Sequence, residues 1–196
     1  MSTPAKINFK LYQGSTFSEV LRWESSLKTY VPITGISKSA PIIITAPAHG
    51  VPVEWRVKFT NILGMADLNS NDTYYQATSV TSDTLTINDI NSLGFKTYIS
   101  GGIVEYNTPI DLTGFKARMQ VRSKVDSSTV IIELTTENNY IVINNVNKTI
   151  NLAIPATITS GFTFSTAVYS LELVSTGGQV TPFCDGTITL VKEVTR

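Results

Sequence analysis

Apolar and polar residues alternate with a period of two along most of the chain, and a helical period of 3.6 is almost absent. This alternation predicts antiparallel strands that bury one face and expose the other. Ala117, Met119 and Val121 form the apolar set of one such strand, and Arg118 and Arg122 lie on its opposite face. The pattern therefore predicts an all-β protein.

Three hairpins are predicted from pairs of alternating segments. The first joins 7–11 to Leu21 and Trp23 across the turn 13–15, the second joins 140–143 to 149–154, and the third joins 167–173 to 188–194. A further strand is expected at 130–134. The single predicted helical turn is 155–160, because Pro155 suits a first helical position and Gly161 a stop. Strands at this spacing are typical of antiparallel sandwiches and barrels.

The middle of the chain, 36–105, differs from its flanks and lies between two similar phrases, 32–35 and 108–114. It holds short predicted strands at 42–45, 56–61, 73–80 and 84–87. We therefore expect a discontinuous antiparallel β-sandwich of the immunoglobulin-like kind, 1–35 with 106–196, that carries 36–105 as an inserted small β-barrel.

The charge balance removes several kinds of partner. Charged residues make up 15% of the 196-residue chain, below the usual quarter or so, and 15 basic residues match 15 acidic ones. With no net charge to attract nucleic acid or an anionic membrane, neither is expected as a partner. The N-terminus has no basic region followed by an apolar run, which predicts synthesis in the cytoplasm without a signal peptide.

No set of residues points to catalysis or to a cofactor. A hydrolase nucleophile needs a base, and the only histidine, His49, stands in a turn, where a structural role is expected. Cys184, the only cysteine, follows Pro182 and Phe183 and is expected to be a buried, inert thiol. No signature selects a pair of carboxylates for glycoside cleavage among Asp83, Asp89, Glu105, Asp111, Glu133, Glu137 and Asp185. We expect no enzyme, no cofactor and no small-molecule ligand.

The segment 67–72 begins like a calcium loop but departs from it. Asp72 stands where the loop requires glycine, and Thr78 stands where it requires a bidentate carboxylate. A structural turn is expected here, with weak calcium binding as the alternative. Trp55, Tyr74 and Tyr98 are candidates for a sugar-stacking platform, although alternating aromatic residues more often fill a β core.

Two phrases carry a resemblance to a known family. Residues 7–17, INFKLYQGSTF, and 109–122, PIDLTGFKARMQVR, resemble tailed-bacteriophage virion proteins in which an Asn-Phe strand and a Gly-x-Thr-Phe turn precede a Pro-x-Asp-Leu-Thr-Gly turn and an Ala-x-Met strand. The resemblance implies the N-terminal domain of baseplate upper proteins or an immunoglobulin-like collar or tail module. Sequence motifs carry the resemblance in the first half of the discontinuous domain, and only the strand pattern carries it in the second half.

The insertion is similar to another module, the small barrel formed by the first catalytic cysteine half-domain of ubiquitin-activating enzymes. The resemblance rests on short phrases at 43–45, 48–50, 57–59, 64–65, 68–69 and 84–85, together with Tyr74. It implies shape alone, because 36–105 contains no cysteine and no adenylation site accompanies it.

The sequence thus predicts a structural component of a tailed-phage virion, in the collar, neck, tail or baseplate, that binds other virion proteins as a homo-oligomer in a ring. Arg118 and Arg122 are the predicted docking surface, with solvated surface charges as the alternative. A second hypothesis is a receptor- or carbohydrate-binding module of the adsorption apparatus that uses Trp55, Tyr74 and Tyr98. A third, a cell-wall hydrolase, lacks an identifiable carboxylate pair.

Overall fold

The structure is a computed structural model that describes residues 3–70 and 72–194. Its regular elements are almost all strands, so the predicted all-β class is confirmed. The single α-helix, α1 (Ala156–Thr159), lies within the predicted helical segment, and a 3-10 turn, η1, covers Ala66–Leu68. The chain folds into two compact units. Unit 1 joins the residues up to Arg22 to those from Asp111 onward, and unit 2 is Trp23–Ile110.

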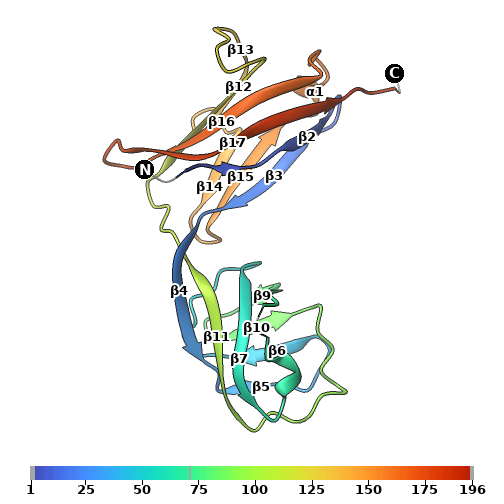
Figure 1. Ribbon diagram of the computed structural model, residues 1–196, viewed down its shortest axis with the longest axis vertical. Coiled ribbons are helices and arrows are strands. Elements are labelled where there is room, and N and C mark those ends of the chain that lie inside the picture. The colour runs from blue at the N-terminus through green and yellow to red at the C-terminus, as the bar shows by residue number, and fades with distance from the viewer. Residues whose placement is uncertain (1–2, 71, 195–196) are drawn as a thin grey trace. The chain divides into compact units, whose positions relative to one another are not determined.

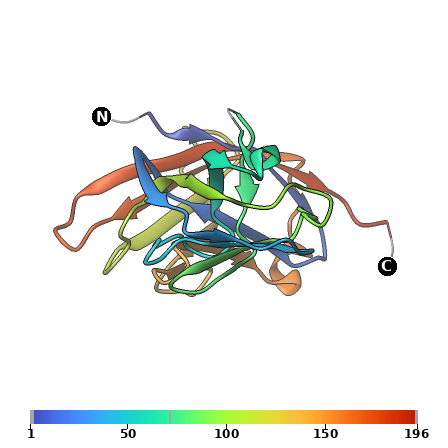
Figure 2. The same ribbon diagram turned by 90° about the horizontal axis from the view of Figure 1, so that it is seen from below.

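Unit 1 contains a six-stranded sheet built around one long hairpin. Its order is β1 (Ala5–Lys6), β17 (Val180–Val191), β16 (Thr166–Val174), β12 (Lys116–Arg122) and β13 (Val130–Thr135), and β2 (Phe9–Tyr12) also pairs with β17. The strands β1 and β2 run parallel to β17, and the other neighbours are antiparallel. The β16–β17 hairpin, drawn orange to red in Figure 2, pairs Ala167 with Ile188 and confirms the predicted third hairpin.

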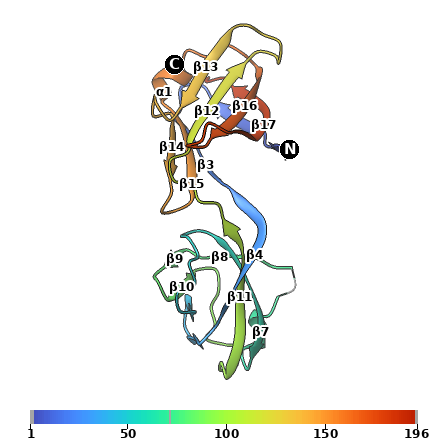
Figure 3. The same ribbon diagram turned by 90° about the vertical axis from the view of Figure 1, so that its left-hand side faces the viewer.

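A three-stranded sheet forms the second layer of unit 1 (Figure 3). Its order is β14 (Ile141–Asn144), β15 (Thr149–Ile154) and β3 (Phe17–Arg22), and the antiparallel β14–β15 pair confirms the predicted second hairpin. The apolar faces of both sheets are buried, including Met119, Leu134 and Leu171 in one layer and Ile150 and Leu152 in the other. Unit 1 is therefore a two-layered, sandwich-like assembly.

The predicted first hairpin is wrong. Although β2 and β3 follow each other around a turn at Gly14 (φ 75°), β2 pairs with β17 and β3 pairs with β15. Both strands carry alternating apolar residues, and the chain crosses from one layer to the other between them, as sandwich connections commonly do. Gly14 and Gly114 (φ 70°) both adopt the left-handed conformation that glycine tolerates in tight turns.

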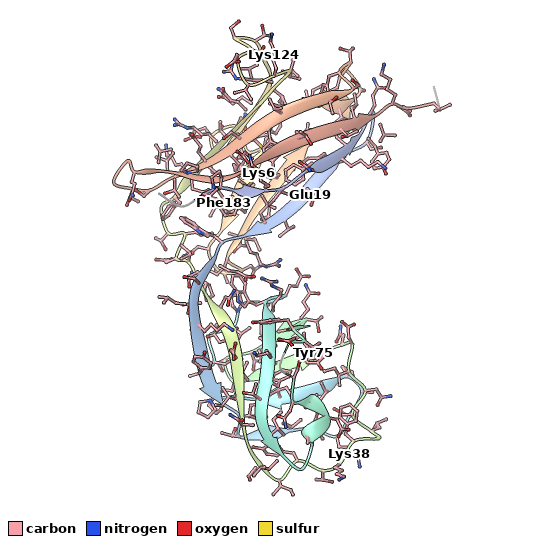
Figure 4. The ribbon with its side chains drawn as sticks, in the orientation of Figure 1. Lys6, Glu19, Lys38, Tyr75, Lys124 and Phe183 are labelled. Carbon is pink, nitrogen blue, oxygen red and sulfur yellow. The ribbon has the colours of Figure 1, made fainter. Side chains whose placement is uncertain are left out.

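Unit 2 contains two four-stranded sheets, visible in Figure 1. One has the order β5 (Gly35–Ile36), β6 (Ile42–Thr45), β10 (Thr84–Ile87) and β9 (Ser79–Val80); the other has the order β4 (Glu24–Pro32), β11 (Ser100–Pro109), β7 (Arg56–Leu63) and β8 (Tyr75–Gln76). Both are open, so the described strands form no closed barrel. The core includes Trp55 and Phe59, and Tyr75, labelled in Figure 4, stacks on Phe59 with ring centroids 5.8 Å apart.

The boundaries of the inserted unit lie outside the predicted 36–105. The phrases 32–35 and 108–114 do not pair with each other. Pro32, at the end of β4, lies opposite Ile103, and Pro109, at the end of β11, lies opposite Glu24, so the two strands pair inside unit 2. Because these strands cover the core of the insertion, the chain passes from unit 1 into unit 2 after Arg22 and returns to unit 1 at Asp111. Among the described residues, no helix is long and apolar enough to cross a membrane.

One hydrogen-bond network holds the turn that leads into β12. Asn145 accepts hydrogen bonds from the Leu112 amide and the Lys148 ammonium, both at 2.8 Å, and its amide donates to Asp111 Oδ1 at 2.9 Å and Thr113 Oγ1 at 2.7 Å. The β14–β15 turn therefore fixes the start of the strand that carries Arg118. The hydrogen bonds that Asp111 accepts lower its pKa to about 2, and the one from Asn145 has the largest effect.

We expect the lowered pKa values of two carboxyls, Asp111 and Glu137, to make the stability of the fold depend on pH in acid. The pKa of Glu137 is also lowered to about 2, chiefly by its hydrogen bond with Lys116, whereas both carboxyls titrate near 4 in an unfolded chain. A lowered folded-state pKa stabilises the fold above the unfolded pKa, and this stabilisation is lost as pH falls from roughly 4 toward 2. The melting temperature should drop over this window, and it should drop less in Asp111→Asn and in Glu137→Gln. Equal drops in wild type and variants would contradict the assignment.

Candidate docking surface

The predicted docking residues, Arg118 and Arg122, lie on the outer face of the six-stranded sheet. Their strand, β12, buries Ala117, Met119 and Val121 on the other face, as the alternation predicts. They line a groove of about 550 Å³ that crosses β13, β12, β16 and β17. The structure therefore brings both arginines to one concave site within unit 1.

The floor of the groove is one row of polar residues in register. Glu133 lies opposite Gln120, Gln120 opposite Ser170, and Ser170 opposite Asp185. The Gln120 amide donates to Glu133 Oε1 at 2.7 Å, and Lys6 forms an ion pair with Asp185 at 2.7 Å from the edge strand β1. Figure 4 labels Lys6 on this sheet. The row offers hydrogen-bonding groups of both kinds to a partner.

The two arginines are held differently. Arg118 Nε donates to Glu172 Oε2 at 2.8 Å on the neighbouring strand, and its side chain stays 55% exposed. Arg122 instead donates to Gln120 Oε1 at 2.7 Å and to the Ser127 carbonyl in the β12–β13 loop, the loop in which Figure 4 labels Lys124. Arg118 is therefore the residue available to a partner, while Arg122 also holds its own hairpin.

Charges in and beside the groove are balanced. Three basic residues, Arg118, Arg122 and Lys6, balance three acidic ones, Glu133, Glu172 and Asp185. An alternating surface of this kind selects a partner by the position of each charge and hydrogen bond, not by a net field. The Glu133 and Asp185 carboxylates stand three strand spacings apart, roughly 14 Å, which exceeds the separation used for glycoside cleavage.

The edge of this sheet is shielded at the C-terminal half of β13. The Asn138 amide donates to the Glu133 carbonyl at 2.9 Å, and its oxygen accepts from the Thr135 amide at 2.9 Å. The side chain thus occupies backbone groups that an added strand would use. The face of the sheet, and not this part of its edge, is therefore the candidate docking surface.

His49 and Cys184 occupy structural positions. His49 is buried in unit 2; its Nδ1 accepts from the Val51 amide at 2.9 Å, and its carbonyl accepts from the Tyr106 hydroxyl. Burial lowers the pKa of His49, so the ring is neutral. Cys184 is buried in unit 1, with its Sγ 3.7 Å from the Tyr169 hydroxyl, and burial raises its pKa to about 11. A thiol with so high a pKa is a poor nucleophile at neutral pH.

The segment 67–72 forms a structural turn in the residues that are described; residue 71 lies outside them. Asn69 Oδ1 accepts from the Ile62 amide at 2.8 Å, and its Nδ2 donates to the Ile62 carbonyl at 3.0 Å. The side chain that would supply a calcium ligand therefore supports β7. Over the described parts of the chain, no three His, Cys, Asp or Glu residues gather as a metal site would require.

The three candidates for a sugar platform, Trp55, Tyr74 and Tyr98, do not form one shared exposed surface, and the core role favoured by the sequence holds for Trp55. Trp55 is 0% exposed and donates from Nε1 to the Asn107 carbonyl at 2.9 Å. Tyr98 packs against the core, and its hydroxyl donates to the Gly101 carbonyl at 2.9 Å. Both serve the core of unit 2, and only Tyr74, which is 40% exposed, offers a ring to solvent.

Tyr74 covers a charged cluster that the sequence did not reveal. The Lys28 and Lys58 ammonium nitrogens lie 6.0 and 5.9 Å from its ring centroid, and Arg56 Cζ lies 5.8 Å from it. Both lysines form ion pairs with Glu105, at 3.5 Å in the case of Lys58. The contact with Lys28 lowers the pKa of Glu105 and raises that of Lys28. The charged residues come from β4, β7 and β11, and Tyr74 precedes β8, so only the strand register could have revealed the cluster.

The comparisons with known proteins add no relative. No protein-family model matches the sequence, and no curated protein is significantly similar to it.

Proposed function

We propose that the protein is a structural component of a tailed-phage virion that acts by docking through the outer face of the six-stranded sheet. On this proposal unit 1 is an immunoglobulin-like sandwich, and unit 2 is a barrel-like insertion whose two sheets remain open. The partners are other virion proteins, and several copies stand around a symmetry axis of the collar, neck, tail or baseplate.

The observation that carries the proposal is the groove beside Arg118. An exposed arginine, held in a defined position by Glu172 across the strand, lies above a row of in-register polar groups. Arginine is enriched at protein interfaces because its planar guanidinium binds carboxylates while its stem covers apolar surface. The resemblance of 7–17 and 109–122 to virion proteins supports the same role, since these phrases supply β2, the turn at Gly114 and β12.

The test is incorporation of variants into phage particles. Arg118→Ala, alone and with Arg122→Ala, should reduce incorporation about tenfold or more, as loss of a central interface arginine does. Arg118→Ala should leave the melting temperature nearly unchanged, because exposed ion pairs contribute about 0–1 kcal/mol. Incorporation is measured by quantitative mass spectrometry of purified particles.

Lys116→Ala is the matched control. Lys116 lies on the same strand and the same face and forms an exposed ion pair with Glu137 at 2.9 Å, but it does not line the groove. This variant should incorporate normally. Normal incorporation of both arginine variants would reject the groove as the contact surface, and equal loss in Lys116→Ala would show a general effect of charge.

A further inference from the structure

In unit 2, four side chains form a row across the outer face of the sheet β4–β11–β7–β8. Tyr30 lies opposite Glu105, and Glu105 lies opposite Lys58. Tyr74 is the fourth side chain and covers one end of the row, because its ring centroid is 5.9 Å from Lys58 Nζ and 6.0 Å from Lys28 Nζ. From Tyr30 to Lys58 the row crosses two strand spacings, roughly 10 Å. Tyr30 thus borders a central pair of opposite charges, and Tyr74 covers it.

The charges of this row are withdrawn from water although they lie on the outer face of the sheet. The side chains of Glu105 and Lys58 are only 11% and 13% exposed, whereas Tyr30 and Tyr74 are 59% and 40% exposed. Burial of charge is costly, and stability alone seldom requires it. Exposed aromatic rings beside shielded charges can bind a ligand, because the rings supply contact area and the polar groups fix its orientation.

The cluster carries one more positive charge than negative. Lys28, Lys58 and Arg56 stand against Glu105 and Glu24. Arg56 is committed to Glu24, to which its Nε and NH2 donate at 3.3 and 2.6 Å. Lys28 and Lys58 share the carboxylate of Glu105, so a second carboxylate at Lys28 would balance the formal charges of these five residues.

Lys28 has room for such a carboxylate. Within the described part of the chain its ammonium donates to Glu105 Oε1 and, at 3.3 Å, to the Tyr74 hydroxyl. An ammonium carries three N–H donors, so a third remains. The Lys28 side chain is 35% exposed, which leaves this donor accessible from solvent.

We infer that this row binds a carboxylate-bearing saccharide. Lys28 binds the carboxylate, and the rings of Tyr30 and Tyr74 pack against the C–H faces of the sugar rings. A peptide of acidic residues alone would satisfy the lysine, but it has no ring to pack against the two tyrosines. The inference concerns unit 2 and does not depend on the docking role proposed for unit 1.

The test is isothermal titration calorimetry of the full chain with a panel of oligosaccharides that contain galacturonate, glucuronate or sialic acid. Each is compared with its methyl ester, and poly-L-glutamate supplies carboxylates without sugar. At least one acidic saccharide should bind, its ester should bind at least tenfold more weakly, and the affinity should fall with added salt. If no member of the panel binds, or if poly-L-glutamate binds as well as the best saccharide, the inference is wrong.

Variants locate the binding. Tyr30→Ala and Lys28→Gln should each weaken the best saccharide about tenfold. Tyr12→Ala is the matched control, because Tyr12 is an exposed tyrosine of unit 1, 52% accessible, with Lys10 Nζ 5.4 Å from its ring centroid. It should bind like wild type. Tyr30 is well exposed, so its variant tests the site even if Lys28→Gln disturbs folding. Unchanged affinity in Tyr30→Ala would reject this site.

Discussion

Met119→Asp is expected to unfold unit 1. Met119 is 0% exposed and lies between Leu134 and Leu171, which are also 0% exposed, in the centre of the six-stranded sheet. The substitution removes a large apolar side chain and leaves a carboxylate in the core without a partner. We expect a loss of more than about 4 kcal/mol in the free energy of unfolding, which is most of the stability of a small domain. Urea denaturation followed by circular dichroism measures it.

Met119→Leu is the control for this change. It keeps the volume and the apolar character of the side chain and should cost less than about 1.5 kcal/mol. If Met119→Asp kept a native transition close to that of the leucine variant, Met119 would not be a core residue.

Trp55→Ala is expected to have a comparable effect on unit 2. Trp55 is fully buried among Val57, Phe59 and other core residues, and its Nε1 donates to the Asn107 carbonyl on β11. Removing the indole leaves a large cavity and an unsatisfied carbonyl, so we expect a loss of about 3–5 kcal/mol. The reason is structural, which is the core role and not the alternative sugar-stacking role considered for Trp55. Thermal unfolding followed by far-ultraviolet circular dichroism, which reports on the backbone, measures this loss of stability.

Trp55→Phe supplies the comparison. It keeps an aromatic ring in the core and loses only part of the volume and the Nε1 hydrogen bond, so its cost should be clearly smaller. Because each unit has its own core, Met119→Asp should spare the transition of unit 2, and Trp55→Ala should spare that of unit 1. A single transition lost completely in both variants would contradict separate cooperative units.

The candidate docking surface shows which features the alternation of apolar and polar residues can predict. The parity of residues in 117–122 suffices to put Arg118 and Arg122 on one face, because successive side chains of a strand point to opposite sides. Odd or even position in a strand gives no information on which residues of the neighbouring strands lie opposite. Glu172 lies opposite Arg118 and Gln120 lies opposite Glu133 only through the pairing of β12 with β16 and β13. The difference between an available Arg118 and a committed Arg122 therefore comes from the fold.

Local features were readable from the sequence because their causes are local. The strand periodicity, the turns at Gly14 and Gly114, the helical turn after Pro155 and the hairpins β14–β15 and β16–β17 each depend on residues close together in the chain. Backbone sterics, proline geometry and short loops act over a few residues, so their effects can be read in order.

Tertiary structure decided the features that depend on which distant segments meet. The separation of β2 from β3 into different layers, the limits of unit 2 at Trp23 and Ile110, and the burial of Trp55 follow from strand pairing and from the closing of two cores. The row of Tyr30, Glu105 and Lys58 joins three strands that are far apart in the chain. Alternation fixes the face on which a side chain lies, but the free energy of burying whole faces selects the neighbouring strands and the register between them.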